Sequence, residues 1–115
     1  MGADCIFCKI VAGEVPAKVV HQDDDVLAFR DIDPKAPTHV LVVPKRHIAS
    51  INDVSGRDDA LLGKIVRTGR DIAAAEGLAE RGYRLVLNAG PDAGYSVFHI
   101  HLHVMGGRAM TWPPG

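Results

Sequence analysis

Three histidines stand at every second position of the stretch SVFHIHLHVMGG, at His99, His101 and His103. Neighbouring imidazoles can together bind a metal ion such as zinc. A neutral imidazole can also attack phosphorus near pH 7, with neighbouring donors binding the phosphate oxygens. Alternatively, the row is only the solvated face of a strand, since polar residues commonly face outward on antiparallel strands. The residues alone leave these three interpretations open.

A second group that could do chemistry is the C-x-x-C pair Cys5 and Cys8, the only two cysteines of the chain. Metal ligation, redox chemistry and plain burial all remain open for such a pair in a reducing compartment. A redox role would require the pair to open a helix after a strand, but only four residues precede Cys5. Metal binding or burial of free thiols is therefore favoured.

The bulk composition limits the partners of these side chains. The 115 residues fit one domain, 1–115, with 47% hydrophobic residues, 23% charged residues and a net charge of -1. No basic excess favours a nucleic-acid partner, and no apolar run approaches the roughly 18–20 residues that span a bilayer. The start MGADCIFCKI also does not resemble a signal peptide. We therefore expect a cytoplasmic protein without a nucleic-acid or membrane partner.

The elements that position the histidines can be read from apolar spacing. The segment CIFCKIVAGEVPAK predicts a short helix ending at Gly13, and residues 19–21 and 26–30 predict a hairpin. THVLVVPK and YRLVLNAG predict two further strands. One long helix begins after Ser55, with Asp58 three residues on, and ends at Gly77. Its predicted buried stripe contains the apolar residues Leu61, Leu62, Ile65, Val66, Ile72 and Ala73.

The predicted last strand is SVFHIHLHVMGG itself, so the fold class is α+β, an antiparallel sheet with helices packed on one face. Alternation places the three histidines on one face. It places the intervening apolar residues on the other, where a helix can cover them: Phe98, Ile100, Leu102 and Val104. The turn NAGPDAG upstream is expected to expose backbone N–H groups beside the row, which suits a phosphate.

The pattern His99-Ile-His101-Leu-His103-Val-Met resembles the signature of the histidine triad (HIT) family. The stretches DIDPKAPTHVLVVPKRHI, RLVLNAG, GYSVFHIHLHVMGGR and MTWPPG resemble its Hint branch, the histidine triad nucleotide-binding proteins, of the bacterial type. This resemblance implies a HIT-like fold with a five-stranded antiparallel sheet, one long helix and one short helix. It also implies a homodimer with a continuous ten-stranded sheet.

The resemblance implies a purine nucleoside phosphoramidase, or nucleotidyl hydrolase, that releases AMP or GMP from conjugates such as adenosine phosphoramidates or aminoacyl-adenylates. His101 would be the nucleophile, His103 would donate to the α-phosphate, and His99 would orient the site with His39 behind it. Ser96 would contact the phosphate and assist the departing amine, and catalysis would need no cofactor. Two alternatives stay open: a dinucleoside polyphosphate hydrolase of the same family, and a nucleotide- or zinc-binding partner protein with incidental turnover.

The same resemblance implies a nucleotide site around His101, His103 and Ser96. Asp31 and Ile32 would lie at the ribose, and Trp112 would reach toward the partner's active site. Further ribose and phosphate contacts would come from Asn88, Gly94 and Val97, and an apolar purine slot from Ile6, Phe7, Ile10 and Phe29. Core packing is the alternative for those four residues, and a mobile tail is the alternative for Trp112.

Three positions of the chain depart from the family pattern. Tyr95, also counted in the nucleotide site, replaces the usual Gln, and Arg30 and Thr111 stand where close eukaryotic relatives tend to have His. We expect these residues at the rim and on the leaving-group side, where they would affect substrate preference.

Bacterial-type relatives also imply a role for the cysteines. Cys5 and Cys8 would combine with His47 and His99 in a Cys₂His₂ set, which suits tetrahedral zinc. This structural zinc would tie the N-terminal helix to the sheet and leave His101 and His103 free. Two free thiols, buried or half-buried, are the alternative.

Overall fold

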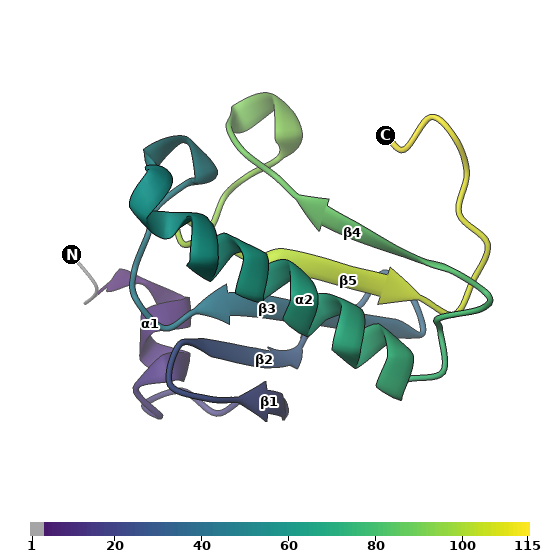
Figure 1. Ribbon diagram of the computed structural model, residues 1–115, viewed down its shortest axis with the longest axis horizontal. Helices are drawn as coiled ribbons and strands as arrows, with labels where there is room; N and C mark the ends of the chain where they lie inside the picture. The colour runs from purple at the N-terminus through teal and green to yellow at the C-terminus, as the bar shows by residue number, and fades with distance from the viewer. Residues whose placement is uncertain (1–3) are drawn as a thin grey trace.

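The computed structural model describes residues 4–115, so the domain predicted over 1–115 extends three residues beyond the described part. These described residues form two α-helices and five strands: α1 (Ile6–Val11), β1 (Val19–Gln22), β2 (Val26–Arg30), β3 (Thr38–Pro44), α2 (Asp59–Ala75), β4 (Tyr83–Leu87) and β5 (Leu102–Gly106). The long helix α2 lies across one face of the sheet (Figure 1). Within residues 4–115, no helix is both long and apolar enough to cross a membrane.

The five strands form one antiparallel sheet in the order β1-β2-β3-β5-β4, which confirms the predicted α+β class and the β1–β2 hairpin. The two helices, however, cover opposite faces. Side chains alternate along a strand, and Ala28 and Val42 pack in the cluster with α2, whereas Phe29 and Val43 pack with Phe7 of α1. The prediction that both helices share one face is therefore wrong, because β2 and β3 are apolar on both sides.

The last strand is shorter than predicted and begins at Leu102 instead of Ser96. Val42 is the last β3 residue paired with β5, opposite Leu102. Continuing this register would place Pro44 opposite Ile100, and a proline has no N–H to donate to the ladder. The N–H of Ile100 instead donates to the carbonyl of Ile48 at 2.8 Å.

Because β5 begins late, one of the four residues predicted to face the helix is not buried. Ile100, Leu102 and Val104 are buried under α2 as predicted, but Phe98 is 64% exposed. It precedes the strand, so the alternation of a strand does not apply to it.

The long helix begins with the predicted capping box, in which Ser55 and Asp58 bond each other's backbone, but this box starts a short 3-10 turn (Gly56–Asp58) ahead of α2. Gly77 ends the helix region with φ 79°, in the left-handed conformation that glycine tolerates best. The buried stripe of α2 is narrower than predicted, because Val66 is 47% exposed and Leu62 only half-buried. Gly69 lies against β5, where an added Cβ would be 3.0 Å from Leu102.

Candidate active site and metal centre

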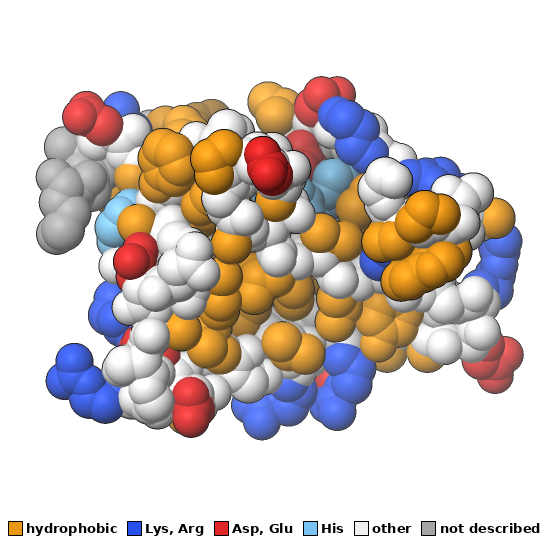
Figure 2. Space-filling model, turned by 90° about the horizontal axis from the view of Figure 1, so that it is seen from above, with side chains coloured by type: hydrophobic (Ala, Val, Ile, Leu, Met, Phe, Trp, Pro, Cys, Tyr) orange, Lys and Arg blue, Asp and Glu red, His pale blue; other side chains and the backbone are white. Residues whose placement is uncertain are grey.

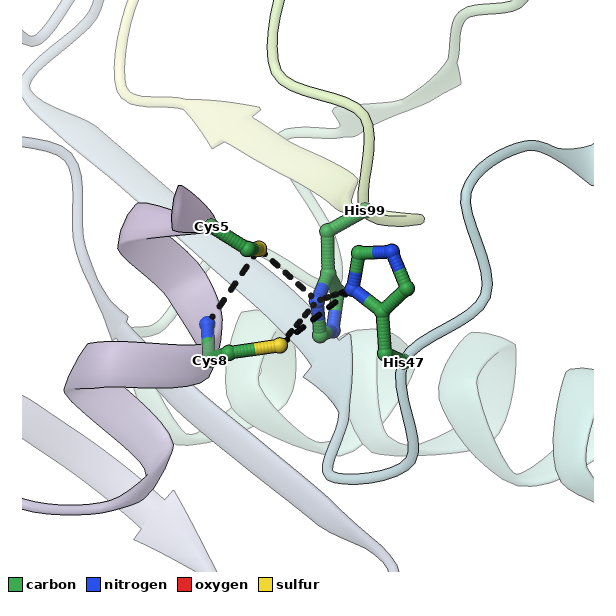
Figure 3. Close-up of side chains that lie close together, drawn as sticks. All are labelled: Cys5, Cys8, His47 and His99. Atoms are coloured by element: carbon green, nitrogen blue, oxygen red, sulfur yellow. Dashed lines mark hydrogen bonds between the residues drawn. The ribbon is translucent and has the colours of Figure 1, made fainter. Parts of the chain in front are cut away.

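The predicted metal ligands Cys5, Cys8, His47 and His99 lie together, although they come from three separate parts of the chain (Figure 3). The sulfur of Cys5 is 3.3 Å from Nδ1 of His99, and the sulfur of Cys8 is 3.2 Å from Nδ1 of His47 and 3.5 Å from Nδ1 of His99. The two Nδ1 atoms are 3.1 Å apart. All four donor atoms lie within 4.8 Å of one another.

This set of donors fits a tetrahedral zinc ion. Zinc bonds of ordinary length place neighbouring N and S ligands about 3.3–3.6 Å apart, close to the separations of the cluster. His99 donates from Nε2 to the carbonyl of Pro44 at 2.8 Å, so the lone pair of its Nδ1 faces the two sulfurs. Burial and the neighbouring Cys5 raise the pKa of Cys8 to about 11, so without an ion this thiol stays protonated. A bound cation would favour its thiolate.

His101, two residues further on, carries its proton on the other ring nitrogen. Its Nδ1 donates to the backbone carbonyl of His99 at 2.8 Å, which leaves the lone pair on Nε2 without that bond. Burial lowers the pKa of His101, so the ring is neutral near pH 7. The tautomer and the charge state are those of a nucleophile that attacks through Nε2.

His103 is oriented by a chain of hydrogen bonds from the loop before β3. The N–H of Lys35 donates to Nδ1 of His39 at 3.0 Å, so the proton of the neutral His39 ring sits on Nε2. That Nε2 donates to Nδ1 of His103 at 2.9 Å, which places the His103 proton on its own Nε2. Asp31 lies 3.4 Å from Nε2 of His39. His103 thus becomes a fixed donor next to His101, whose ring centroid is 5.0 Å away.

Two findings about His39 and His103 follow from these bonds. The prediction that His39 lies behind His99 is wrong, because His39 bonds His103, which lies on the neighbouring strand. Burial, together with the nearby His101 and His39, lowers the pKa of His103 to about 4, and burial also lowers the pKa of His39. Both rings are therefore neutral donors at pH 7.

The turn before the histidines differs from the expected phosphate cradle. The N–H groups of Ala93, Gly94 and Tyr95 donate to carbonyls within the turn itself, so these three do not face an anion. Gly94 has φ 75° and closes the turn. Ser96 is exposed. It lines a cavity of about 320 Å³, and the same cavity is lined by Cys5, His47 and Val97. Asn88 is half-buried after β4.

The predicted purine slot divides into buried and exposed members. Phe7 and Phe29 are buried at 7% and 4% exposure and meet edge-on at 5.5 Å, so they also serve the core. Ile10 packs against the same cluster and Ile6 is 41% exposed. Phe7 additionally contacts the rings of His99 and His101, at 5.9 and 5.1 Å between centroids. The slot therefore borders His101.

Other predicted nucleotide contacts lie at the surface. Ile32 is fully exposed and Trp112 is 82% exposed, on the tail that follows β5. Asp31 accepts from the N–H of Asp33 at 2.8 Å, with one carboxylate oxygen toward His39. Arg30 forms a bidentate ion pair with Glu76 at the end of α2, and the carbonyl of Thr111 accepts from Arg84.

The position predicted for Tyr95 is also wrong. It is only 8% exposed, and its ring stacks on His101 at 5.4 Å and 13°, so it is not at the rim. The backbone groups of Lys35, Pro44 and His99 that set the tautomers were also missed. A backbone group leaves no signal in residue type, and the stacking follows from the turn that brings residue 95 back over the strand.

Comparison with known proteins agrees with this fold. A family model described as HIT domain matches residues 12–110, and the chain belongs to this family. A HIT family hydrolase from Legionella pneumophila, solved by crystallography, is 58% identical with a TM-score of 0.96, and the match covers 97% of this chain and 100% of that one.

Two further relatives carry informative names. A protein of Escherichia coli named purine nucleoside phosphoramidase is 46% identical over 110 residues, which cover 96% of this chain and 92% of that protein. A Zn-bound histidine triad family protein from Mycobacterium smegmatis is 36% identical with a TM-score of 0.81, covering 94% of this chain and 78% of that one.

Proposed function

We propose that this protein is a purine nucleoside phosphoramidase, a hydrolase that releases AMP or GMP from P–N linked conjugates through a nucleotidyl-histidine intermediate. The observation that carries the proposal is that the neighbouring rings of His101 and His103 offer opposite groups, an electron pair on one and a proton on the other. His101 is neutral with its Nε2 lone pair available, and His103 is held as an Nε2 donor beside it. The phosphoramidase name of the Escherichia coli relative supports this reaction class.

In the proposed first step, Nε2 of His101 forms a bond to the α-phosphorus. The P–N bond of the conjugate breaks, and its electron pair leaves with the amine, which takes up a proton from solvent with the assistance of Ser96. His103 donates to a phosphate oxygen, where negative charge increases. The bond from Nδ1 of His101 to the carbonyl of His99 keeps the attacking nitrogen in the required tautomer throughout.

In the second step, a water oxygen bonds to phosphorus and the electron pair of the N–P bond returns to His101. The water proton passes to solvent and the nucleoside monophosphate leaves. The ribose would be held by Asp31, whose carboxylate can accept from both hydroxyls, and the purine by the slot around Phe7. Ile32, Asn88, Gly94 and Val97 complete the proposed contacts.

Trapping the intermediate tests this function. Wild-type protein mixed with an adenosine phosphoramidate and quenched within milliseconds should gain the mass of one adenylyl group, located on His101 by peptide mapping. A parallel guanosine conjugate measures purine preference, and diadenosine triphosphate tests the polyphosphate alternative. Absence of an adduct, or faster turnover of diadenosine triphosphate than of the phosphoramidate, would contradict the proposal.

We also propose a structural zinc at Cys5, Cys8, His47 and His99. A bound ion would cross-link α1, the loop after β3 and His99. It would take no part in the reaction steps. The donor distances and the deprotonated Nδ1 of His99 support this site, as does the Zn-bound Mycobacterium smegmatis relative. Metal analysis of the purified protein, expected at one zinc per chain, tests it.

A homodimer remains part of the proposal. β4 is an edge strand of the sheet, and Leu87 at its end and Val66 on α2 are exposed apolar side chains. Figure 2, seen from above in the orientation of Figure 1, shows hydrophobic side chains gathered across the middle of this face, with Lys and Arg side chains around them. Unpaired edges and apolar faces favour pairing with a second copy. Sedimentation at micromolar concentration should show twice the mass of one chain.

A further inference from the structure

The ring of Tyr95 contacts His101, and this contact has no role in the proposed reaction steps. The Tyr95 ring lies nearly parallel to the His101 ring, with 5.4 Å between centroids and 13° between planes. Phe7 meets the same imidazole edge-on, at 5.1 Å and 78°. The imidazole is therefore held by two aromatic side chains as well as by its bond to the His99 carbonyl.

Tyr95 itself is fixed at its far end. Its hydroxyl donates to the backbone carbonyl of Ala49 at 2.6 Å, and its ring packs edge-on against Phe98 at 5.8 Å. Burial raises the pKa of the Tyr95 phenol, so it remains a neutral donor. The adjacent Ile48 carbonyl accepts from the N–H of Ile100, which ties the Ala49 loop to the segment just before β5. A buried ring anchored in this way costs little reorganisation during a reaction.

We propose that Tyr95 is a positioning residue whose ring face stabilises the positive charge that His101 acquires while it is bonded to phosphorus. This inference rests on the proposed function. The neutral ring carries a proton on Nδ1 and attacks through Nε2, so formation of the N–P bond leaves one positive charge on the imidazole. Cleavage of the N–P bond by water returns the electron pair to Nε2 and removes that charge.

An aromatic ring presents a negative face, and a cation within about 6 Å of its centroid is attracted, more strongly at desolvated sites. The Tyr95–His101 stack meets this distance with both rings buried. The stabilisation would exist only while the ring is charged, so it would lower the barrier to the intermediate and leave substrate binding unaffected. We expect the loss of this contact to slow adduct formation about tenfold, the order expected from such a contact.

Substitution at position 95 tests the inference. Single-turnover formation of the adenylyl-enzyme and steady-state KM are measured for Tyr95→Leu, Tyr95→Phe and a series in which Tyr95 is replaced by phenylalanine with one, two or three ring fluorines. Fluorination weakens the negative ring face while keeping the shape, so the series separates charge stabilisation from packing. Tyr83→Leu is the matched control, since Tyr83 lies in β4 and packs against the α2-side core.

The inference expects Tyr95→Leu to slow adduct formation about tenfold at unchanged KM, Tyr95→Phe to restore most of that loss, and each added fluorine to slow the reaction further. Tyr83→Leu should lower the melting temperature without changing the rate. A rate of adduct formation that stays the same along the fluorine series, or a raised KM at unchanged kcat, overturns the inference. The wild-type adduct would in that case still support the proposed function. Absence of any adduct in the wild type overturns both.

Discussion

His99 and His101 are two residues apart in the segment that leads into β5, but they present opposite ring nitrogens. His99 donates from Nε2 to Pro44 and turns Nδ1 toward the cysteines, whereas His101 donates from Nδ1 to the His99 carbonyl and keeps Nε2 available. The acceptor that each ring meets fixes its tautomer. One imidazole can therefore serve as a metal ligand and its neighbour as a nucleophile, with no difference in residue type.

The surroundings strengthen this division. The nitrogen offered by His99 lies within 3.5 Å of two sulfur atoms, which are soft ligands for zinc. His101 instead has aromatic rings on its sides and the donor His103 nearby. The metal region, which consists of Cys5, Cys8, His47 and His99, would therefore contribute stability. His101 and His103 would contribute the chemistry. The following predictions test this separation.

The largest expected effect is on turnover. His101→Asn removes the proposed nucleophile and should lower phosphoramidate turnover at least about a thousandfold, as expected when a covalent catalyst is deleted. Zinc content should stay close to wild type, because His101 bonds the backbone carbonyl of His99 and not its ring. His21→Asn, in β1 and paired with Asp23, is the control and should keep full activity. Full turnover by His101→Asn would refute the division.

The complementary change affects stability. Cys5→Ser combined with Cys8→Ser should abolish zinc binding and lower the free energy of unfolding by about 3–4 kcal/mol, as expected when free zinc exceeds its Kd by a hundred- to a thousandfold. Denaturant unfolding of the variant, and of wild type with and without a chelator, measures this. Adduct formation on His101 should persist in the variant at low temperature. If the chelator changes nothing in wild type, the metal region is not a zinc site.

A smaller effect is expected from the residue that orients His103. His39→Asn removes the Nε2 donor that bonds Nδ1 of His103, so kcat should fall about tenfold at similar KM, the order of one net hydrogen bond. His47→Asn is the comparison, because it should reduce zinc content and spare kcat. A kcat unchanged by His39→Asn would show that His103 is oriented without it.

The smallest effect is a pH dependence of stability. The pKa of folded His103 is about 4, below its ordinary value of 6.5, so the unfolded chain binds more protons between these values. The contribution of this ring is fully present well above pH 6.5 and is lost as the pH drops toward 4, by about 1 kcal/mol over roughly the first pH unit below 6.5. Denaturant unfolding of His103→Asn should show a shallower decline than wild type. Equal slopes would contradict the role of burial.

Much of this arrangement could be predicted because it rests on apolar spacing and local signals. The five strands, the capping box at Ser55 and the terminator Gly77 depend on residues within a few positions of one another. Predictions failed where distant segments decide. Phe98 is exposed because the register against Pro44 ends the strand early, and the helices lie on opposite faces because β2 and β3 have two apolar sides.

The fold class, the family resemblance and the presence of two candidate groups of histidines could be predicted from the residues alone, because residue types and periodicity are local properties of the chain. The folded chain was needed to show which nitrogen each histidine offers, that His39 bonds His103, and that Tyr95 lies against His101. Those features depend on backbone carbonyls and N–H groups brought together by folding. Every residue except proline carries both groups, so no pattern of side chains reveals which of them will meet.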